Sequence, residues 1–161
     1  MPQFKTGNVW TAYTAADLFL ITTNSTLKKS SHALVMGRGI AQQARDRSPG
    51  LAEALGQHIL KTCGSLGEYS LLISPRWPDA KLGAFQVKRH YRQAASLELI
   101  QRSTAALRAW CTEHPDAIVH LNYPGIGNGR LRREDVLPIV MQLPDQVTIW
   151  EYPLPGKGKV L

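Results

Sequence analysis

The chain has 161 residues, of which 43% are hydrophobic and 19% are charged. These proportions suit one folded domain with one buried core, spanning residues 1–161, and exclude a disordered chain. A net charge of +7 and a pI near 9.7 favour anionic partners such as nucleic acid or phosphorylated ligands, although a solvated basic surface explains the charge equally well.

Segments that favour strands and helices alternate along the chain. Short apolar, β-branched runs predict buried strands, and apolar residues at helical spacing predict helices. In chain order we expect a strand at 18–23, helices at 40–47 and 49–60, a strand at 69–73, a helix at 96–111, a strand at 117–121, a helix at 134–143 and a strand at 147–150. This alternation favours helices on both faces of a sheet. Residues 153–161 are expected to form a loose tail.

Two helix starts carry capping signals. Ser48 followed by Pro49 predicts a cap and first-turn pair for the helix at 49–60, and Ser96 is the expected N-cap of the helix at 96–111. That helix is predicted to bury one stripe of side chains, which consists of Leu97, Ile100, Thr104, Leu107 and Cys111.

The sequence offers no signal for a membrane, a leader or a metal. No apolar run reaches about 18 residues, and residues 1–7 lack the apolar core of a signal peptide, so we expect a cytoplasmic protein without a membrane partner. Cys63 and Cys111 have no metal-type spacing and are expected to be reduced thiols.

Two glycine-rich segments depart from what packing requires. Residues 35–41 (VMGRGIA) follow a strand that ends near Asn24 and lead into a helix, and residues 124–131 (PGIGNGRL) precede a helix that starts near Arg133. Glycines let a backbone approach a ligand, and first-turn N–H groups favour an anion. Either segment alone is more often a tight turn, and neither fits the P-loop or dinucleotide patterns. Together they predict one phosphate-binding crevice at the carboxyl ends of the strands.

The order and spacing of several motifs resemble a macrodomain over residues 7–152. The motifs are Gly7-Asn8-Val9, LITTN at 20–24, MGRGIA at 36–41, FQVKRHY at 85–91, PGIGNG at 124–129 and VTIW at 147–150. The resemblance implies an α/β fold, a three-layer αβα sandwich with a central mixed sheet, which holds ADP-ribose. The segments at 36–41 and 85–91 are most similar to the branch of terminal ADP-ribose glycohydrolases and antitoxins that remove ADP-ribose from DNA, and to related phage and bacterial macrodomains.

The resemblance also implies the ligand-binding residues. It places Asn8 or Val9 and Trp150 at the adenine end, Asn24 beside the distal ribose, and the two glycine segments around the diphosphate. The implied set is Asn8, Val9, Asn24, Met36, Gly37, Arg38, Gly39, Ile40, Ala41, Gly125, Ile126, Gly127, Asn128, Gly129 and Trp150. Without the resemblance, Asn24 can be interpreted as a turn residue at the end of a strand, and Trp150 as an aromatic residue of the core.

Lys88 aligns with the catalytic lysine of this branch. A lysine can act electrostatically on the glycosidic bond or attack C1 as a neutral amine, whereas the basic run at 88–92 is otherwise typical of a solvated surface. Gly129 stands where the protein-directed glycohydrolase has an aspartate that helps to resolve a covalent adduct. The DNA-directed antitoxin works without that aspartate, so the glycine favours a DNA substrate over a protein substrate.

Three functions remain open from the sequence. The first is an ADP-ribosyl hydrolase that acts through Lys88 on a modified macromolecule. The second is a module that binds ADP-ribose or a related nucleotide metabolite without catalysis. The third is a basic nucleic-acid-binding domain whose glycine segments are turns. We expect a monomer that needs no cofactor and no metal.

Overall fold

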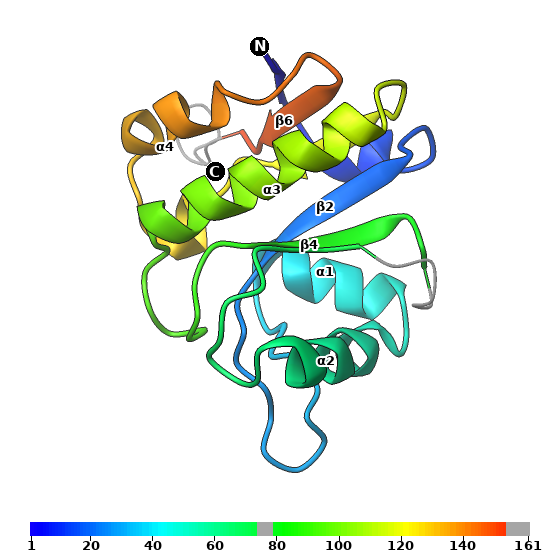
Figure 1. Cartoon of the computed structure of the whole chain (residues 1–161), viewed down its shortest axis with the longest axis vertical. Helices are drawn as coiled ribbons and strands as arrows, with labels where there is room; N and C mark the ends of the chain where they lie inside the picture. The colour runs from blue at the N-terminus through cyan, green and yellow to red at the C-terminus, as the bar shows by residue number, and fades with distance from the viewer. Residues whose placement is uncertain (74–78, 154–161) are drawn as a thin grey trace, which may run out of the picture.

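The computed structural model describes residues 1–73 and 79–153, so the predicted tail lies outside the described residues except for Pro153. A six-stranded sheet lies between two layers of helices (Figure 1). The strands are β1 (Gln3–Thr6), β2 (Leu18–Thr23), β3 (Leu71–Leu72), β4 (Leu82–Gln86), β5 (Val119–Asn122) and β6 (Val147–Glu151). The helices are α1 (Gly39–Arg47), α2 (Leu51–Thr62), α3 (Leu97–Glu113) and α4 (Arg133–Val140), with 3₁₀ turns η1 (Val9–Ala12) and η2 (Gly127–Gly129).

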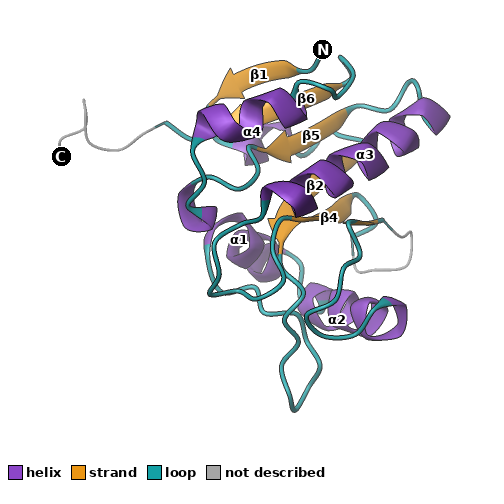
Figure 2. Ribbon diagram, turned by 60° about the vertical axis from the view of Figure 1, so that its left-hand side comes forward, coloured by secondary structure: helices purple, strands orange, loops and turns teal. Residues whose placement is uncertain are grey.

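The sheet has the strand order β1-β6-β5-β2-β4-β3. Neighbouring strands are parallel except for β3, which runs antiparallel to β4. Helices α1 and α2 cover one face and α3 and α4 cover the other (Figure 2). The predicted three-layer αβα sandwich with a central mixed sheet is therefore confirmed.

Alternating side chains of the central strand β2 supply both cores. Phe19 and Ile21 pack in the core under α1 and α2, whereas Leu18 and Leu20 pack in the core under α3 and α4. This is the two-residue period of a strand with both faces covered. Because both faces of β2 are covered, the apolar run that predicts this strand is continuous and does not alternate with polar residues.

Strands β1 and β4 were not among the predicted elements. Residues 3–6 of β1 are all exposed and mostly polar, so they carry no apolar run. Strand β4 is fully buried but contains Gly83 and ends in Gln86, and both weaken the strand signal. Strand β3 is shorter than the predicted 69–73 because Ser70 has a φ of 64°, which no strand residue adopts.

The capping predictions have different outcomes. Ser96 caps α3 as expected, because its side chain accepts a hydrogen bond from the N–H of Leu99. The Ser48-Pro49 prediction is wrong: Ser48 ends α1, and α2 begins at Leu51 after Gly50, whose φ of 91° turns the chain. Glycine adopts this conformation without strain. The chain turns at Gly50, so α2 begins at Leu51 and not at Pro49.

Helix α3 buries most of the predicted stripe. Ile100, Thr104, Leu107 and Cys111 are buried, but Leu97 is 39% exposed, and Leu99 fills the core in its place. In the first turn of α3 the buried stripe therefore contains Leu99 and not Leu97. No helix in residues 1–73 and 79–153 has the length and apolarity needed to span a membrane. Both cysteines are unpaired.

Helix α2 lies so close to the loop at residues 32–33 that Gly56 leaves no room for a side chain. A Cβ atom at Gly56 would lie 1.9 Å from the carbonyl oxygen of His32 and 2.9 Å from Cα of Ala33. We expect Gly56→Ala to lower the free energy of unfolding by about 1–3 kcal/mol, because backbone must move. Urea unfolding measures this loss. Lys61→Ala on the exposed side of α2 should change it by less than about 0.5 kcal/mol, and equal stability of the two variants would contradict the close packing.

Candidate functional site

A cavity of about 1080 Å³ opens where the parallel strands β2, β4, β5 and β6 end. In such sheets this edge is the usual place for a ligand. Every sequence-predicted site residue except Asn8 lines it, namely Val9, Asn24, Met36, Gly37, Arg38, Gly39, Ile40, Ala41, Lys88, Gly125, Ile126, Gly127, Asn128, Gly129 and Trp150. The structure therefore brings the two glycine segments and the lysine together, while their role in binding stays a prediction.

Asn8 is not part of the cavity wall. Its side-chain oxygen accepts a hydrogen bond from the N–H of Trp10 at 3.0 Å and caps the short turn η1. The adjacent Val9 is buried and faces the cavity. Of the two residues expected at one end of the ligand, the structure therefore favours Val9 and gives Asn8 a local capping role.

The first glycine segment presents a helix N-terminus to the cavity. Helix α1 begins at Gly39, and its N-cap residue Arg38 makes no side-chain capping hydrogen bond. The first N–H groups of a helix have no acceptor within it and attract an anion. A Cβ atom at Gly37 would meet no atom within 4 Å, so the cavity is open directly above this backbone.

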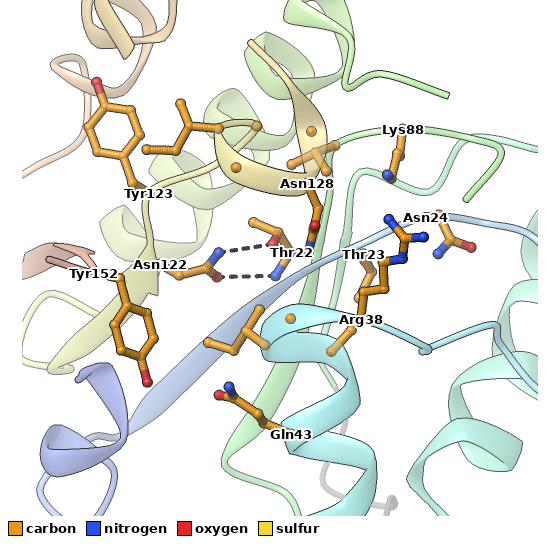
Figure 3. A pocket seen from close by; sticks show the side chains of 18 of the residues that line it. Thr22, Thr23, Asn24, Arg38, Gln43, Lys88, Asn122, Tyr123, Asn128 and Tyr152 are labelled. Carbon is orange, nitrogen blue, oxygen red and sulfur yellow. Dashed lines mark hydrogen bonds between the residues drawn. The ribbon is translucent and has the colours of Figure 1, made fainter. Parts of the chain in front are cut away.

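The second glycine segment lies against the first. A Cβ atom at Gly39, where φ is 57°, would come within 2.9 Å of the side-chain nitrogen of Asn128. Gly127 has a φ of 68°, in the region that glycine adopts without strain. Figure 3 shows the Asn128 side chain on the cavity wall above Thr22. The two segments thus form adjoining walls of one cavity.

Asn24 uses its polar atoms to hold the first glycine segment. Its side-chain nitrogen donates to the carbonyl of Val35 at 2.9 Å, and its oxygen accepts from the N–H of Thr26 at 2.7 Å. These bonds fix the backbone that leads to Gly37. The side chain is 7% exposed and borders the cavity, and its place beside the distal ribose stays a prediction.

Sequence reasoning missed several cavity residues. Asn122, at the end of β5, donates to the hydroxyl of Thr22 at 2.9 Å and accepts from its N–H at 3.2 Å (Figure 3). Gln43, on the second turn of α1, accepts a hydrogen bond from the indole of Trp10. An asparagine directly after an apolar run is the available signal for Asn122, but the partners of both residues depend on tertiary contacts.

Lys88 is half-buried in the cavity wall just beyond β4. Its Nζ donates to the carbonyl of Tyr91 at 3.0 Å, and its own carbonyl accepts from the buried amide of Gln86 at 3.2 Å. Burial lowers the pKa of Lys88, and the nearby charges of Arg130 and Arg38 lower it further. The amine is therefore easier to deprotonate than that of a solvated lysine.

The charge of the cavity wall is strongly positive. Four cationic residues line it, namely Arg38, Lys88, Arg92 and Arg130. Glu151 is the one carboxylate among the described lining residues, and it pairs with Arg133 at 2.9 Å. Such a wall favours a ligand that carries several negative charges.

Gly129 is closed to a side chain by its neighbour. A Cβ atom there would lie 3.0 Å from Cβ of Ala95, and the carbonyl of Gly129 accepts a hydrogen bond from the N–H of Ala95. A residue larger than glycine would have to displace Ala95 by a few tenths of an ångström. The cavity is thus built without a carboxylate at this position.

In residues 1–73 and 79–153, no group of three or more His, Cys, Asp or Glu residues is suited to hold a metal ion.

The chain matches no protein-family model and no curated protein. Solved structures do match it. The macrodomain of Mycobacterium tuberculosis DarG is 26% identical, with a TM-score of 0.69, over 96% of this chain and 99% of that one. The macrodomain of Thermus aquaticus DarG is 21% identical, with a TM-score of 0.70, over 96% and 99%. Thermosipho africanus DarTG, solved in complex with ADP-ribose, is 17% identical, with a TM-score of 0.70, over 96% of this chain and 43% of that one.

The sheet order and the two helical layers are those of the macrodomain fold. Among macrodomains, the chain is similar to those of DarG. The family resemblance stated from the sequence motifs is thereby confirmed.

Proposed function

We propose that this chain binds ADP-ribose in the cavity and hydrolyses the bond that joins ADP-ribose to a modified macromolecule, with DNA favoured over protein. Lys88 is the catalytic residue of this proposal. The observation that carries it is the half-buried Lys88 amine in a cationic cavity between two glycine segments. The likeness to DarG macrodomains, and to DarTG with ADP-ribose, supports it.

Binding in this proposal depends on charge and on backbone donors. The diphosphate lies at the start of α1, where first-turn N–H groups and the positive end of the helix dipole favour an anion. Arg38 and Arg130 add positive charge on the same side of the cavity. Gly37 and Gly127 allow the phosphates to approach the backbone closely.

The chemistry follows from the lowered pKa of Lys88. The neutral amine attacks C1 of the distal ribose, so that an Nζ–C1 bond forms while the bond from C1 to the modified group breaks, and the leaving group takes up a proton. Water then replaces the lysine at C1, which releases ADP-ribose and restores the amine. Burial, the largest cause of the lowered pKa of Lys88, still acts when a bound diphosphate offsets the charges of Arg38 and Arg130.

Two features favour DNA as the modified macromolecule. Arg92 and Arg130 lie at the cavity and are exposed, and the side chain of Arg130 donates to the carbonyl of Arg92 at 2.7 Å, which fixes these two residues side by side. Arginines beside a cavity can contact phosphates without reading sequence. The second feature is Gly129, since the position offers no carboxylate to resolve a protein adduct.

The test is release of ADP-ribose from two substrates, ADP-ribosylated DNA and ADP-ribosylated protein. We expect faster release from DNA, and a rate on DNA at subsaturating substrate that falls as salt rises, because phosphate contacts are screened and counterion release is reduced. Arg92→Ala should reduce that salt dependence and leave release from protein unchanged. Equal rates on both substrates, or faster release from protein, would contradict the DNA preference.

A second function is a binding module without catalysis. It is favoured by the pairing of Glu151 with Arg133, which leaves no unpaired carboxylate among the described lining residues. Such a module would bind ADP-ribose and release none from either substrate. The same two assays therefore separate the two functions.

A further inference from the structure

Trp150 is held in the cavity wall by one hydrogen bond to a buried histidine. The indole Nε1 donates to Nδ1 of His120 at 2.8 Å. Trp150 is 9% exposed and His120 is 8% exposed. His120 pairs in register with Thr148 on β6, two residues before Trp150, so both side chains lie on the same face of neighbouring strands.

The other contacts of the indole are packing contacts, because Trp150 belongs to the core under α1 and α2. The ammonium group of Lys5 lies over the ring, 5.5 Å from its centroid, and this attraction has little directional preference. Gly7 lies beside the ring, since a Cβ atom there would be 3.5 Å from Cζ3. Among the described residues, His120 is the hydrogen-bond acceptor that holds the Nε1–H edge of the packed ring.

This bond requires a neutral imidazole. Nδ1 must accept, so the ring proton is on Nε2, and a doubly protonated ring would present an N–H to the indole N–H. Burial lowers the pKa of His120, and the charge of Lys5 on β1 lowers it further. Of the other elements on this face, β2 and η1 have no ionisable residue, and Glu151 on β6 pairs with Arg133. Helix α1 carries Arg45, Asp46 and Arg47, of which Arg45 and Asp46 pair with each other and Arg47 lies over the Trp10 ring.

We infer that His120 is a positioning residue for ligand recognition, which fixes the Trp150 indole so that a planar aromatic group of the ligand packs against it. A fixed aromatic surface binds such a group better than one that must be ordered on binding. This inference rests on the proposed function for the identity of the ligand, ADP-ribose, whose adenine is the planar group.

The test compares two substitutions of His120. His120→Asn keeps an acceptor near the Nδ1 position and cannot titrate, whereas His120→Leu removes the acceptor and leaves the indole N–H unpaired. At about pH 7.5 we expect His120→Asn to bind ADP-ribose within about 3-fold of the wild type, and His120→Leu to bind about 10-fold more weakly. Calorimetric titration gives both affinities.

The pH profile separates positioning from a purely structural role. Wild-type affinity should fall as pH drops through a value below 6.5, because protonation of His120 breaks the bond, and this fall should be absent from His120→Asn. The same fall in both proteins, or equal binding by His120→Leu, would overturn the inference. If His120→Leu does not fold, the two pH profiles still decide.

The indole proton resonance of Trp150 gives a readout without ligand. It should shift with pH in the wild type, with the same midpoint as the loss of affinity, and stay constant in His120→Asn. A wild type that binds no ADP-ribose but shows this shift would sink the proposed function and leave the positioning of Trp150 intact. No shift with pH would overturn the positioning itself.

Discussion

Replacing Lys88 with alanine should slow the release of ADP-ribose from a modified substrate by at least about 10³-fold, while free ADP-ribose still binds. Loss of a nucleophile removes the reaction path, whereas in our proposal much of the binding comes from the glycine segments and from Arg38 and Arg130, which line the cavity. Single-turnover release assays measure the first effect and calorimetric titration the second. Release at an undiminished rate would contradict the role of Lys88.

Lys88→Arg separates attack by the amine from electrostatic assistance. A guanidinium keeps the positive charge but does not lose its proton in proteins. We expect Lys88→Arg to be as inactive as Lys88→Ala if the amine attacks C1, and partly active if the charge alone assists. The wild-type rate should also rise with pH and level off below 10.5, because burial, Arg130 and Arg38 lower the pKa of Lys88 and the neutral form reacts.

The same pKa shift predicts that loss of activity will not reflect unfolding. Because the pKa of Lys88 is lower in the folded chain, the unfolded chain holds this proton more tightly. The side chain therefore destabilises the fold at pH values below its lowered pKa, and this effect disappears as pH rises towards 10.5. Lys88→Ala should melt no earlier than the wild type at neutral pH, apart from the lost bond to the carbonyl of Tyr91.

The sequence predicts those parts of the site whose chemistry is local. The glycines at 37, 39, 125, 127 and 129 are conspicuous in the sequence, because they cluster in two connections that each lead into a helix. The strand β2 is also predicted correctly, because both of its faces are covered and its residues are all apolar or β-branched. These signals place the cavity at the correct edge of the sheet.

What the sequence cannot predict depends on contacts between distant residues. Asn8 matches a family motif, yet its side chain caps η1, because the N–H of Trp10 lies within reach. His120 looks like any polar residue in a strand until β5 and β6 are in register and its ring meets Trp150. Lys88 was singled out by resemblance alone, since its burial and its lowered pKa arise from the fold.

Gly37→Glu should abolish ADP-ribose binding and leave the fold intact. A Cβ atom at Gly37 meets no atom within 4 Å, and the φ of Gly37 lies outside the left-handed region, so a side chain can start from this position without a clash at Cβ and without backbone strain. The carboxylate extends into the cavity beside the start of α1, where the diphosphate binds in our proposal. Volume and like charge together should weaken binding by at least about 10²-fold.

Gly37→Ala is the matched control, because it adds a methyl group without charge at the same position. We expect it to bind ADP-ribose within about 3-fold of the wild type, and both variants to keep the wild-type melting temperature within about 2 °C. Gly127→Glu is a weaker choice, since Gly127 has a φ of 68° and any side chain there strains the backbone. Undiminished binding by Gly37→Glu would contradict the placement of the diphosphate at the start of α1.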